Sequence, residues 1–290
     1  MAATAAERWA QARSFHHSPY PAERIAAERE HSVSVCLPAR ECSQTVGAIV
    51  TELIELRDRG MIDEVVVVDG ASADGTAAVA ESAGAVVWQE AELMPSHGPV
   101  LGRGDAMWRA LSALGGELVC FLDPQAEGPV AHRLGGLLGP LVCERDVSFV
   151  KAFHTSSCQQ QRRATDAHED GRVNHLMARP ALALFYPELA GVREPLAGEL
   201  AARRELLERL PFASGEELEI AMLIDVWRKL GLQAIAQVDL GERRSRRRAD
   251  SPTARKVLSA IARRLEQDGR LRGGGEGARE RPPLESVRVA

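Results

Sequence analysis

Four consecutive valines at residues 65–68 stand directly before an acid and a glycine, in the run DEVVVVDGASADGT at residues 63–76. An unbroken β-branched run is typical of a strand that is buried on both faces of a parallel sheet. Asp69 then falls at the carboxyl end of the strand, where open α/β sheets bind ligands. We interpret Ser72 and Asp74 as the cap and first-turn residues of a following helix. An ordinary strand-to-helix connection would look the same, so this run constrains the fold more than the function.

Apolar segments alternate between strand and helix patterns along most of the chain. This order predicts an α/β protein with a mostly parallel, doubly wound sheet flanked by helices. We expect strands at residues 32–37, 64–68, 85–88, 117–122, 150–153 and 234–238. We expect helices at residues 45–56, 77–83, 105–114, 173–185, 199–207, 216–230 and 253–265. Pro38 is predicted to end the first strand. Gly231 is predicted to end the helix at residues 216–230.

Changes in pattern divide the chain into four regions. Residues 1–30 are expected to form a helical arm outside the sheet, and residues 31–150 a first, ligand-binding half of the main domain. Residues 151–250 form a second half, which includes a polar loop at 155–171. Residues 251–290 are predicted to contain one helix and then a disordered tail, because glycines and a Pro-Pro pair follow residue 272.

Composition excludes several classes of protein. Of the 290 residues, 45% are hydrophobic, which is ample for a large core. The chain has no stretch near the ~18 apolar residues of a membrane span and no leader pattern, so we expect a cytoplasmic protein without a membrane partner. A net charge of −5 does not suggest nucleic-acid binding. The five cysteines lack a paired metal spacing and are expected to be reduced core thiols, with a metal or nucleophile role as the alternative: Cys36, Cys42, Cys120, Cys143 and Cys158.

Three further segments carry polar residues at strand ends or at a helix start. LPARE (37–41) follows the first strand, RGDAMWR (103–109) opens a helix, and FLDPQ (121–125) follows a strand in the place of an Asp-x-Asp motif. Together with residues 63–76, they resemble the GT-A glycosyltransferases, specifically the retaining glucosyl-3-phosphoglycerate synthase family and its mannosyl relatives. The resemblance runs from about residue 31 to residue 250 and implies a GT-A fold.

The resemblance assigns a role to each polar cluster. It implies that a nucleoside contacts Pro38, Ala39, Glu41, Asp69 and Ser72. Arg103 stands where the family has a lysine that approaches the diphosphate, and arginine keeps the charge but changes the geometry.

Two further clusters match the family's sugar and acceptor sites. Glu199 and Glu219 match acids near the sugar and the acceptor, and with Asp123 they are the catalytic candidates. The family's Gly-Arg-x-Thr segment, which binds the phosphate and carboxylate of 3-phosphoglycerate, matches Gly171, Arg172 and Asn174.

The family's metal site is altered in this chain. In the family, both acids of the Asp-x-Asp motif and a downstream histidine hold a divalent metal against the sugar diphosphate. Asp123 matches the first acid, but Gln125 replaces the second, and Ser245 stands at the histidine position. Because Mg²⁺ and Mn²⁺ prefer charged oxygen ligands, we expect at most weak metal binding, through Asp123 if at all.

A transferase must still stabilise the departing diphosphate, and arginines can replace a metal in that role. We therefore hypothesise that no cofactor is required. The candidate cations are Arg103 and members of the RRSRRR run at residues 243–248, namely Arg243, Arg244 and Arg246. A solvated surface is the alternative explanation for that run.

These patterns predict a glycosyltransferase that moves a sugar from a UDP- or GDP-linked donor to a small polar acceptor. The acceptor is either 3-phosphoglycerate or a hydroxyl or thiol compound of specialised metabolism. Retention of configuration and a homodimer are implied by the resemblance. Two alternatives stay open: a catalytically inactive paralogue that binds nucleotide sugars, and a nucleotidyltransferase, although residues 37–41 lack the Gly-rich loop of that class.

Overall fold

The computed structural model describes residues 3–155, 173–241, 244–245, 254–271 and 280–287. Within them, eight strands form a central sheet in the order β1-β10-β7-β8-β5-β2-β3-β4. β8 is antiparallel to both of its neighbours and the other pairs are parallel, which confirms the predicted mostly parallel α/β class. The strands are β1 (Ser14–His16), β2 (Val33–Ala39), β3 (Glu64–Asp69), β4 (Val86–Gln89), β5 (Leu118–Phe121), β7 (Phe149–Phe153), β8 (Leu200–Arg203) and β10 (Ile235–Asp239).

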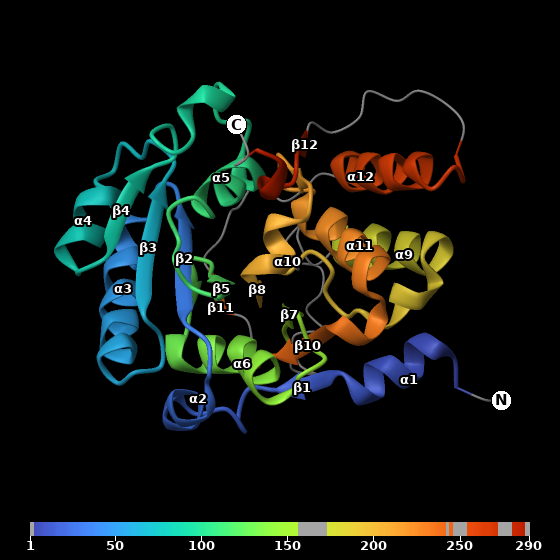
Figure 1. The fold of residues 1–290 in the computed structure, drawn as a ribbon, viewed down its shortest axis with the longest axis horizontal. Coiled ribbons are helices and arrows are strands. Elements are labelled where there is room, and N and C mark those ends of the chain that lie inside the picture. The colour runs from blue at the N-terminus through green and yellow to red at the C-terminus, as the bar shows by residue number, and fades with distance from the viewer. Residues whose placement is uncertain (1–2, 156–172, 242–243, 246–253, 272–279, 288–290) are drawn as a thin grey trace.

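Helices cover both faces of this sheet, as Figure 1 shows for α5 and α11 on one side and α2 and α6 on the other. The α-helices are α1 (Ala5–Ala12), α2 (Ala22–Glu28), α3 (Ser43–Asp58), α4 (Thr76–Ser82), α5 (Arg103–Ala110), α6 (Val130–Cys143), α9 (Arg179–Phe185), α10 (Arg204–Glu208), α11 (Leu218–Leu230) and α12 (Ala254–Gln267). Shorter helical turns are η1 (Pro95–His97), η3 (Asn174–Ala178), η4 (Pro187–Gly191), η5 (Leu232–Ala234) and η6 (Leu284–Ser286).

Side chains of β3 alternate between two hydrophobic cores. Val66 and Val68 pack in one core with α5 and α11, whereas Val65 and Val67 pack in the other with α3 and α6. A strand whose two faces are both covered needs apolar residues at every position. The double burial therefore accounts for the unbroken valine run.

The first strand runs further than predicted. β2 continues through Pro38 to Ala39, and Pro38 pairs with Val68. Pairing of β2 with β5 stops at Cys36, so β3 is the one neighbour paired with β2 at Pro38. A strand position with one paired neighbour tolerates a residue without an N–H group.

The expected N-terminal arm is part of the sheet rather than outside it. Residues Ser14–His16 form β1, which pairs in parallel with β10 at the sheet edge. α1 is fixed beside it because Trp9 is buried and its indole N–H donates to the carbonyl of Ile235 at 2.9 Å. The helical part of this prediction is correct, but the separation from the sheet is wrong.

Two segments have a different secondary structure from the one expected. The predicted helix at 199–207 begins as β8, because this segment pairs with both β5 and β7 in the buried centre of the sheet. Pairing in the sheet overrides local helix propensity there. α6 was not predicted, because Pro140 and several glycines disguise it. A Cβ at Gly139 would lie 2.2 Å from the ring of Tyr20, so the glycine permits close packing of the helix.

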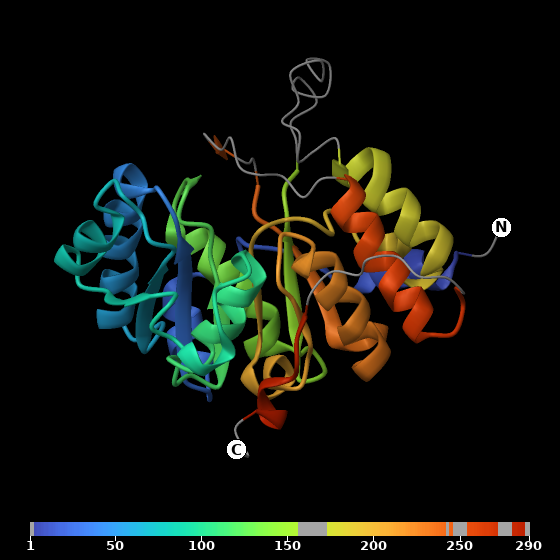
Figure 2. The same ribbon diagram turned by 90° about the horizontal axis from the view of Figure 1, so that it is seen from above.

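The C-terminal segment is ordered where it packs back on the domain, so the expected disorder is wrong for residues 280–287. β12 (Glu280–Arg281) pairs with β9 (Phe212–Ala213), and Trp108 donates its indole N–H to the carbonyl of Pro282 at 2.9 Å. β12 lies beside α5, and Figure 2 shows α12 beside α9 and α11. The glycine-rich residues 272–279 lie outside the described part of the chain.

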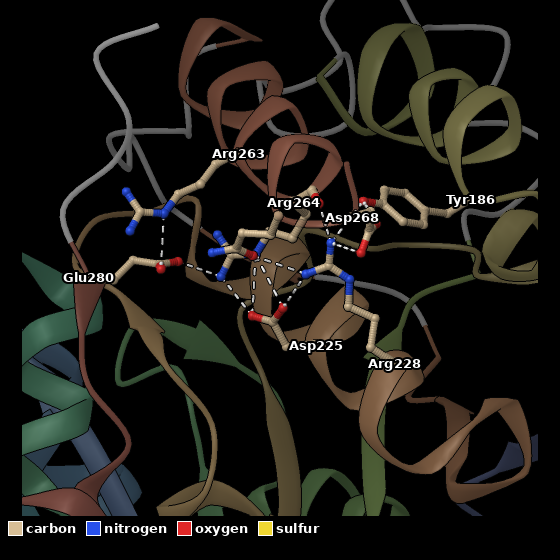
Figure 3. Close-up of polar contacts among 8 residues, drawn as sticks. Tyr186, Asp225, Arg228, Arg263, Arg264, Asp268 and Glu280 are labelled. Atoms are coloured by element: carbon tan, nitrogen blue, oxygen red, sulfur yellow. Dashed lines mark hydrogen bonds and ion pairs between the residues drawn. The ribbon is translucent and has the colours of Figure 1, made fainter. Parts of the chain in front are cut away.

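Charged side chains attach α12 to the rest of the domain (Figure 3). Arg264 is fully buried and contacts Asp225 of α11 at 2.6 Å and Glu280 of β12 at 2.5 Å. Arg228 also contacts Asp225, at 3.2 Å. One buried network therefore joins α11, α12 and the C-terminal strand.

Two exclusions can be checked directly. No helix among the described residues is long and apolar enough to cross a membrane. Cys36, Cys42 and Cys120 are buried free thiols and Cys143 is a partly buried one, as expected, whereas Cys158 lies outside the described residues. Burial raises the pKa of the Cys42 thiol to about 11, which disfavours the reactive thiolate.

Candidate functional site

Strand ends bring the main candidate residues to one edge of the sheet. β2 and β3 end at the paired residues Ala39 and Asp69, and β5 ends two residues before Asp123. β8 runs in the opposite direction, so the residue before its start, Glu199, reaches the same edge. The amide N–H of Asp123 donates to Glu199 Oε1 at 3.1 Å. The antiparallel strand thus places an acid beside the Asp-x-Asp position.

The nucleoside candidates form a hydrogen-bonded cluster. Asp69 is buried and accepts from Ser72 Oγ at 2.6 Å and from Ser72 N at 3.0 Å. Ser72 Oγ accepts from Glu41 N at 2.9 Å, and Glu41 Oε1 accepts from Ala73 N at 2.7 Å. The loops after β2 and β3 are therefore held together. The structure brings Asp69, Ser72 and Glu41 into one group, with Ala39 next to it through its pairing with Asp69.

Ser72 is not the helix cap that the sequence suggested, because its hydroxyl is bonded to Asp69. The helix α4 starts at Thr76 after Gly75, whose φ of 85° is left-handed. Asp74 takes part in capping instead: its carboxylate accepts from Thr76 N and from Ser43 N, both at 3.0 Å. A hydrogen bond from the Thr76 hydroxyl has the largest effect on the pKa of Asp74. Together with the bonds from the two backbone N–H groups, it lowers that pKa to about 2. One carboxylate thus ties the N-termini of α3 and α4.

Two residues other than glycine adopt left-handed backbone in these loops. Glu41 has φ 50° and Ala71 has φ 55°. This conformation is costly for residues with a Cβ, and strained backbone of this kind clusters at active sites and ligand-binding sites. The hydrogen bonds of Glu41 and Ser72 hold both loops in it. The local geometry therefore agrees with a binding role for this cluster.

Asp123 and Glu199 belong to a second group that includes a residue not singled out from the sequence. Arg133 of α6 is buried, and its Nη1 lies 2.5 Å from Glu199 Oε1 and 3.2 Å from the carbonyl oxygen of Asp123. Gln125 donates its backbone N–H to Asp123 Oδ1 at 2.9 Å. The signal that could have identified Arg133 is one arginine among apolar residues, but the helix that carries it was itself missed.

Backbone pairing brings the segment at 244–245 next to the Asp-x-Asp position. β11 (Arg244–Ser245) pairs antiparallel with β6 (Ala126–Glu127), and Ser245 is opposite Ala126. The chain position that holds a histidine in the related family therefore lies beside the loop of Asp123. Arg243 and Arg246 fall outside the described residues, as does the side chain of Arg244.

Arg103 belongs to a third charged group. Its Nη1 lies 2.9 Å from Glu219 Oε1, and its Nη2 donates to the carbonyl of Gly198 at 2.9 Å. Lys151 lies 3.1 Å from the other oxygen of Glu219. Burial acts to raise the pKa of Glu219, but the two cations and their hydrogen bonds outweigh it, and the pKa lies below its usual value. A lysine in an apolar strand was the signal for Lys151, which the sequence reasoning gave no role.

Glycines fix the start of the helix that carries Arg103. A Cβ at Gly104 would lie 1.9 Å from the carbonyl oxygen of Ala213, and Gly102 has φ 139°. The chain can approach β9 this closely only without side chains at these positions. This approach places Arg103 against α11, which carries Glu219.

The acceptor candidates are only partly described. Asn174 is buried, and its Oδ1 accepts from the backbone N–H of Leu196 at 3.0 Å. Its side-chain oxygen therefore supports the segment that leads to Glu199. Gly171 and Arg172 fall outside the described residues.

The oxygen donors near Asp123 suit a divalent metal that also binds a diphosphate. No group of three or more His, Cys, Asp or Glu side chains in the described part of the chain is arranged to hold a metal ion. Asp123 provides a carboxylate, one oxygen of which accepts from the backbone N–H of Gln125 at 2.9 Å. The side-chain amide of Gln125 donates from Nε2 to the carbonyl of Arg40 at 3.4 Å. Mg²⁺ is commonly bound by one or two carboxylates together with substrate phosphates, so this small set of donors fits such a shared site.

The comparisons with known proteins agree on one family. The model of Glycosyl transferase family 2 matches residues 34–189. A glucosyl-3-phosphoglycerate synthase of Mycolicibacterium smegmatis is 39% identical over 263 residues, which cover 90% of this chain and 86% of that protein. The crystal structure of mannosyl-3-phosphoglycerate synthase from Rubrobacter xylanophilus matches with a TM-score of 0.86 and 41% identity, over 98% of both chains.

A further structure bears on the ligands. Glucosyl-3-phosphoglycerate synthase from Mycobacterium tuberculosis, solved in complex with Mn²⁺, UDP-glucose and phosphoglyceric acid, matches with a TM-score of 0.82 and 34% identity. The match covers 95% of this chain and 99% of that one. The Mn²⁺ in this relative contradicts our expectation of a metal-independent protein. A divalent metal is plausible in this chain as well.

Proposed function

Because this chain belongs to glycosyl transferase family 2, we propose that it transfers glucose from UDP-glucose to 3-phosphoglycerate. It is a glycosyltransferase that uses a nucleotide sugar, which confirms the prediction from the sequence. The sequence alone left UDP and GDP open. The relative solved with UDP-glucose and phosphoglyceric acid supports the UDP donor and this acceptor. Mannose is the second candidate sugar, because the similar Rubrobacter xylanophilus protein is named for it.

The observation that carries the proposal is the grouping of Asp69, Asp123 and Glu199 at one edge of the sheet. In open α/β sheets, this edge is where nucleotides bind. We assign the nucleoside to the cluster of Asp69, Ser72 and Glu41, next to Pro38 and Ala39. Glu199, held against the backbone of Asp123 at 3.1 Å, is assigned to the sugar. The sugar diphosphate would then extend from the end of β3 towards the end of β5.

A divalent metal would be held on the protein side by Asp123 and the amide oxygen of Gln125. When bound, such an ion stabilises the negative charge of the departing diphosphate. The backbone N–H of Gln125 fixes Asp123 Oδ1 and so sets the direction of the carboxylate. We also expect arginines to contact the diphosphate in addition to the metal. The candidates are Arg103 and the run that contains Arg243, Arg244 and Arg246.

Glu219 is better suited to orienting Arg103 than to moving a proton. Both of its oxygens are engaged by cations, Arg103 at 2.9 Å and Lys151 at 3.1 Å. A carboxylate in this setting stays ionised, because protonation would remove the nearest counter-charge of the buried Lys151 and of the partly buried Arg103, whose next carboxylate, Glu216, lies 4.0 Å away. Its role is to keep Arg103 at the edge of the site.

Transfer with retention of configuration fits this arrangement without a carboxylate nucleophile. The departing phosphate oxygen can accept the proton of the acceptor hydroxyl on the face where the new bond forms. The residues then contribute by holding donor and acceptor in position and by stabilising charge. Gly171, Arg172 and Asn174 stay the predicted acceptor contacts, and a homodimer stays a prediction that light scattering can check.

The test is a transfer assay with purified protein and Mn²⁺. UDP-glucose, GDP-glucose and GDP-mannose are each supplied with 3-phosphoglycerate, and the products are identified by ³¹P and ¹H NMR. We expect a glucosylated product and free UDP, loss of the product with excess EDTA, and an α-anomeric proton that reports retention. Asp123→Ala should lower kcat by ~10²-fold or more, from the loss of electrostatic stabilisation. The exposed Asp58→Ala serves as the matched control and should change nothing.

Three outcomes decide against parts of the proposal. Thermal stabilisation by UDP-glucose without turnover of any donor would favour the inactive paralogue. Release of pyrophosphate from a sugar phosphate and a nucleoside triphosphate would indicate a nucleotidyltransferase. Turnover with a small hydroxyl or thiol compound, but not with 3-phosphoglycerate, would move the acceptor to specialised metabolism.

A further inference from the structure

Arg133 is a buried cation at the edge of the sheet where the proposed site lies. It extends from the first turn of α6, and 6% of its side chain is exposed. One nitrogen, Nη1, makes both of its recorded contacts, with Glu199 Oε1 at 2.5 Å and with the carbonyl of Asp123 at 3.2 Å. The same Glu199 oxygen accepts from Asp123 N at 3.1 Å. Arg133 and Glu199 therefore hold the Asp123 backbone between them, at both its N–H and its carbonyl.

Stability alone does not account for this arginine. Its Nε and Nη2 are buried and have no hydrogen-bond partner among the described residues, and the same holds for Glu199 Oε2. Buried donors without partners are unfavourable, and a well-packed apolar residue often replaces a buried ion pair without loss of stability. Arg264, away from the site, has one buried nitrogen without a partner in the described part of the chain, Nη1, but its Nε and Nη2 contact two carboxylates. Arg133 has two such nitrogens and contacts one carboxylate. The incomplete bonding of Arg133 points to a task other than folding.

The contacts of Arg133 connect two parts of the proposed chemistry. Asp123 is assigned to the metal and diphosphate, and Glu199 to the sugar. The C–O bond that breaks during transfer joins the sugar to the diphosphate, so the relative position of these two residues matters for the rate. Misplacement of reacting groups by ~1 Å can lower a rate by ~10²-fold.

We propose that Arg133 is a positioning residue that fixes Glu199 against the Asp123 segment and so aligns the sugar with the departing diphosphate. The inference rests on the proposed transfer function. Arg133 does not need to contact the substrate in order to act in this way. It predicts that Arg133 acts on the chemical step through Glu199, with little effect on donor binding.

The experiment measures the wild-type protein first, so that failure of the proposed function is seen before any variant is interpreted. Arg133→Met, Arg133→Lys, Glu199→Gln and the double variant are then compared for kcat, for KM of UDP-glucose, and for the ratio of transfer to hydrolysis of the donor. Arg264→Met is the control for loss of a buried arginine far from the site. Thermal melts report whether each variant is folded.

We expect Arg133→Met to lower kcat by ~10²-fold with KM for UDP-glucose within about twofold, and to raise the share of donor lost to hydrolysis. Arg133→Lys should recover part of kcat, because a cation remains beside Glu199. In the Glu199→Gln background, Arg133→Met should lower kcat by less than about threefold, since residues that act as a unit are not additive. Arg264→Met should lower the melting temperature without changing the ratio of transfer to hydrolysis.

Two results would overturn the proposal. One is an Arg133→Met variant that is folded and keeps the wild-type kcat and ratio of transfer to hydrolysis. The other is a full and additive loss in the Glu199→Gln background, which would show that Arg133 does not act through Glu199. If Arg133→Met does not fold, the double variant, which removes both buried charges, and Arg133→Lys still provide the comparison.

Discussion

Replacing Asp225 with alanine should destabilise this protein through the charged network between α11 and α12 (Figure 3). Asp225 accepts from Arg264 Nη2 at 2.6 Å and from Arg264 Nε at 3.2 and 3.3 Å, and it contacts Arg228 at 3.2 Å. Arg264 is fully buried. In the variant, Glu280 is the carboxylate that still contacts the Arg264 guanidinium in the described part of the chain.

The magnitude follows from this burial. Removing one partner of a buried ion pair costs about 3–5 kcal/mol. Because Glu280 still lies 2.5 Å from Arg264, we expect the lower end, about 3 kcal/mol in the free energy of unfolding. For a domain of this size, that corresponds to a fall of roughly 6–12 °C in melting temperature. Addition of 1 M NaCl should leave the difference nearly unchanged, because buried pairs are screened little.

Urea unfolding followed by circular dichroism and by tryptophan fluorescence measures the effect. The double variant Asp225→Leu/Arg264→Met should recover most of the loss, because replacing both charges with apolar groups avoids an unpaired buried ion. A loss below about 1 kcal/mol in Asp225→Ala would refute the reasoning, as would a double variant no more stable than the single one.

Two other predictions test the C-terminal strand and the nucleoside loops. Burial acts to raise the pKa of Asp105, but the Arg281 hydrogen bonds at 2.7 and 3.0 Å and further contacts outweigh it and lower the pKa. A lowered folded-state pKa gives stability that is present above the unfolded value near pH 4 and is lost as the pH falls through the folded value. Arg281→Met should therefore lower the free energy of unfolding by about 2 kcal/mol at pH 7, and in urea titrations its difference from wild type should shrink below pH 4. The control Arg57→Met, at an exposed ion pair, should show no such trend. A difference between Arg281→Met and wild type that stays constant with pH would contradict the assignment. Ala71→Gly should change the free energy of unfolding by less than about 0.5 kcal/mol, because glycine relieves the left-handed backbone but also adds freedom to the unfolded chain. The control Ala78→Gly, on the exposed face of α4, should lower the free energy of unfolding by about 1 kcal/mol. Equal losses at the two positions would show that residue 71 is not strained.

Local pattern was sufficient for most of the strands and helices. The valine run predicted a strand covered on both faces, and it therefore placed the acid that follows at the ligand-binding edge of a parallel sheet. Prediction failed where packing between distant segments decided the outcome. β8 is a strand because β5 and β7 flank it, and α6 is a helix in spite of its glycines because they let it approach Tyr20. Neither reason is visible within the segment concerned.

The amino-acid sequence by itself determined the α/β class, the family and the acids at the ends of strands, because these depend on local spacing and on motifs that each occupy a few residues. Only the tertiary structure decided which charges meet. Arg133 joins Glu199 across 66 residues of chain, and Lys151 joins Glu219 across 68. Such pairs form because the antiparallel strand β8 and the helix α11 bring their acids to the edge of the sheet where the parallel strands end. A sequence pattern records what lies nearby along the chain, whereas the chemistry of this site depends on what lies nearby in space.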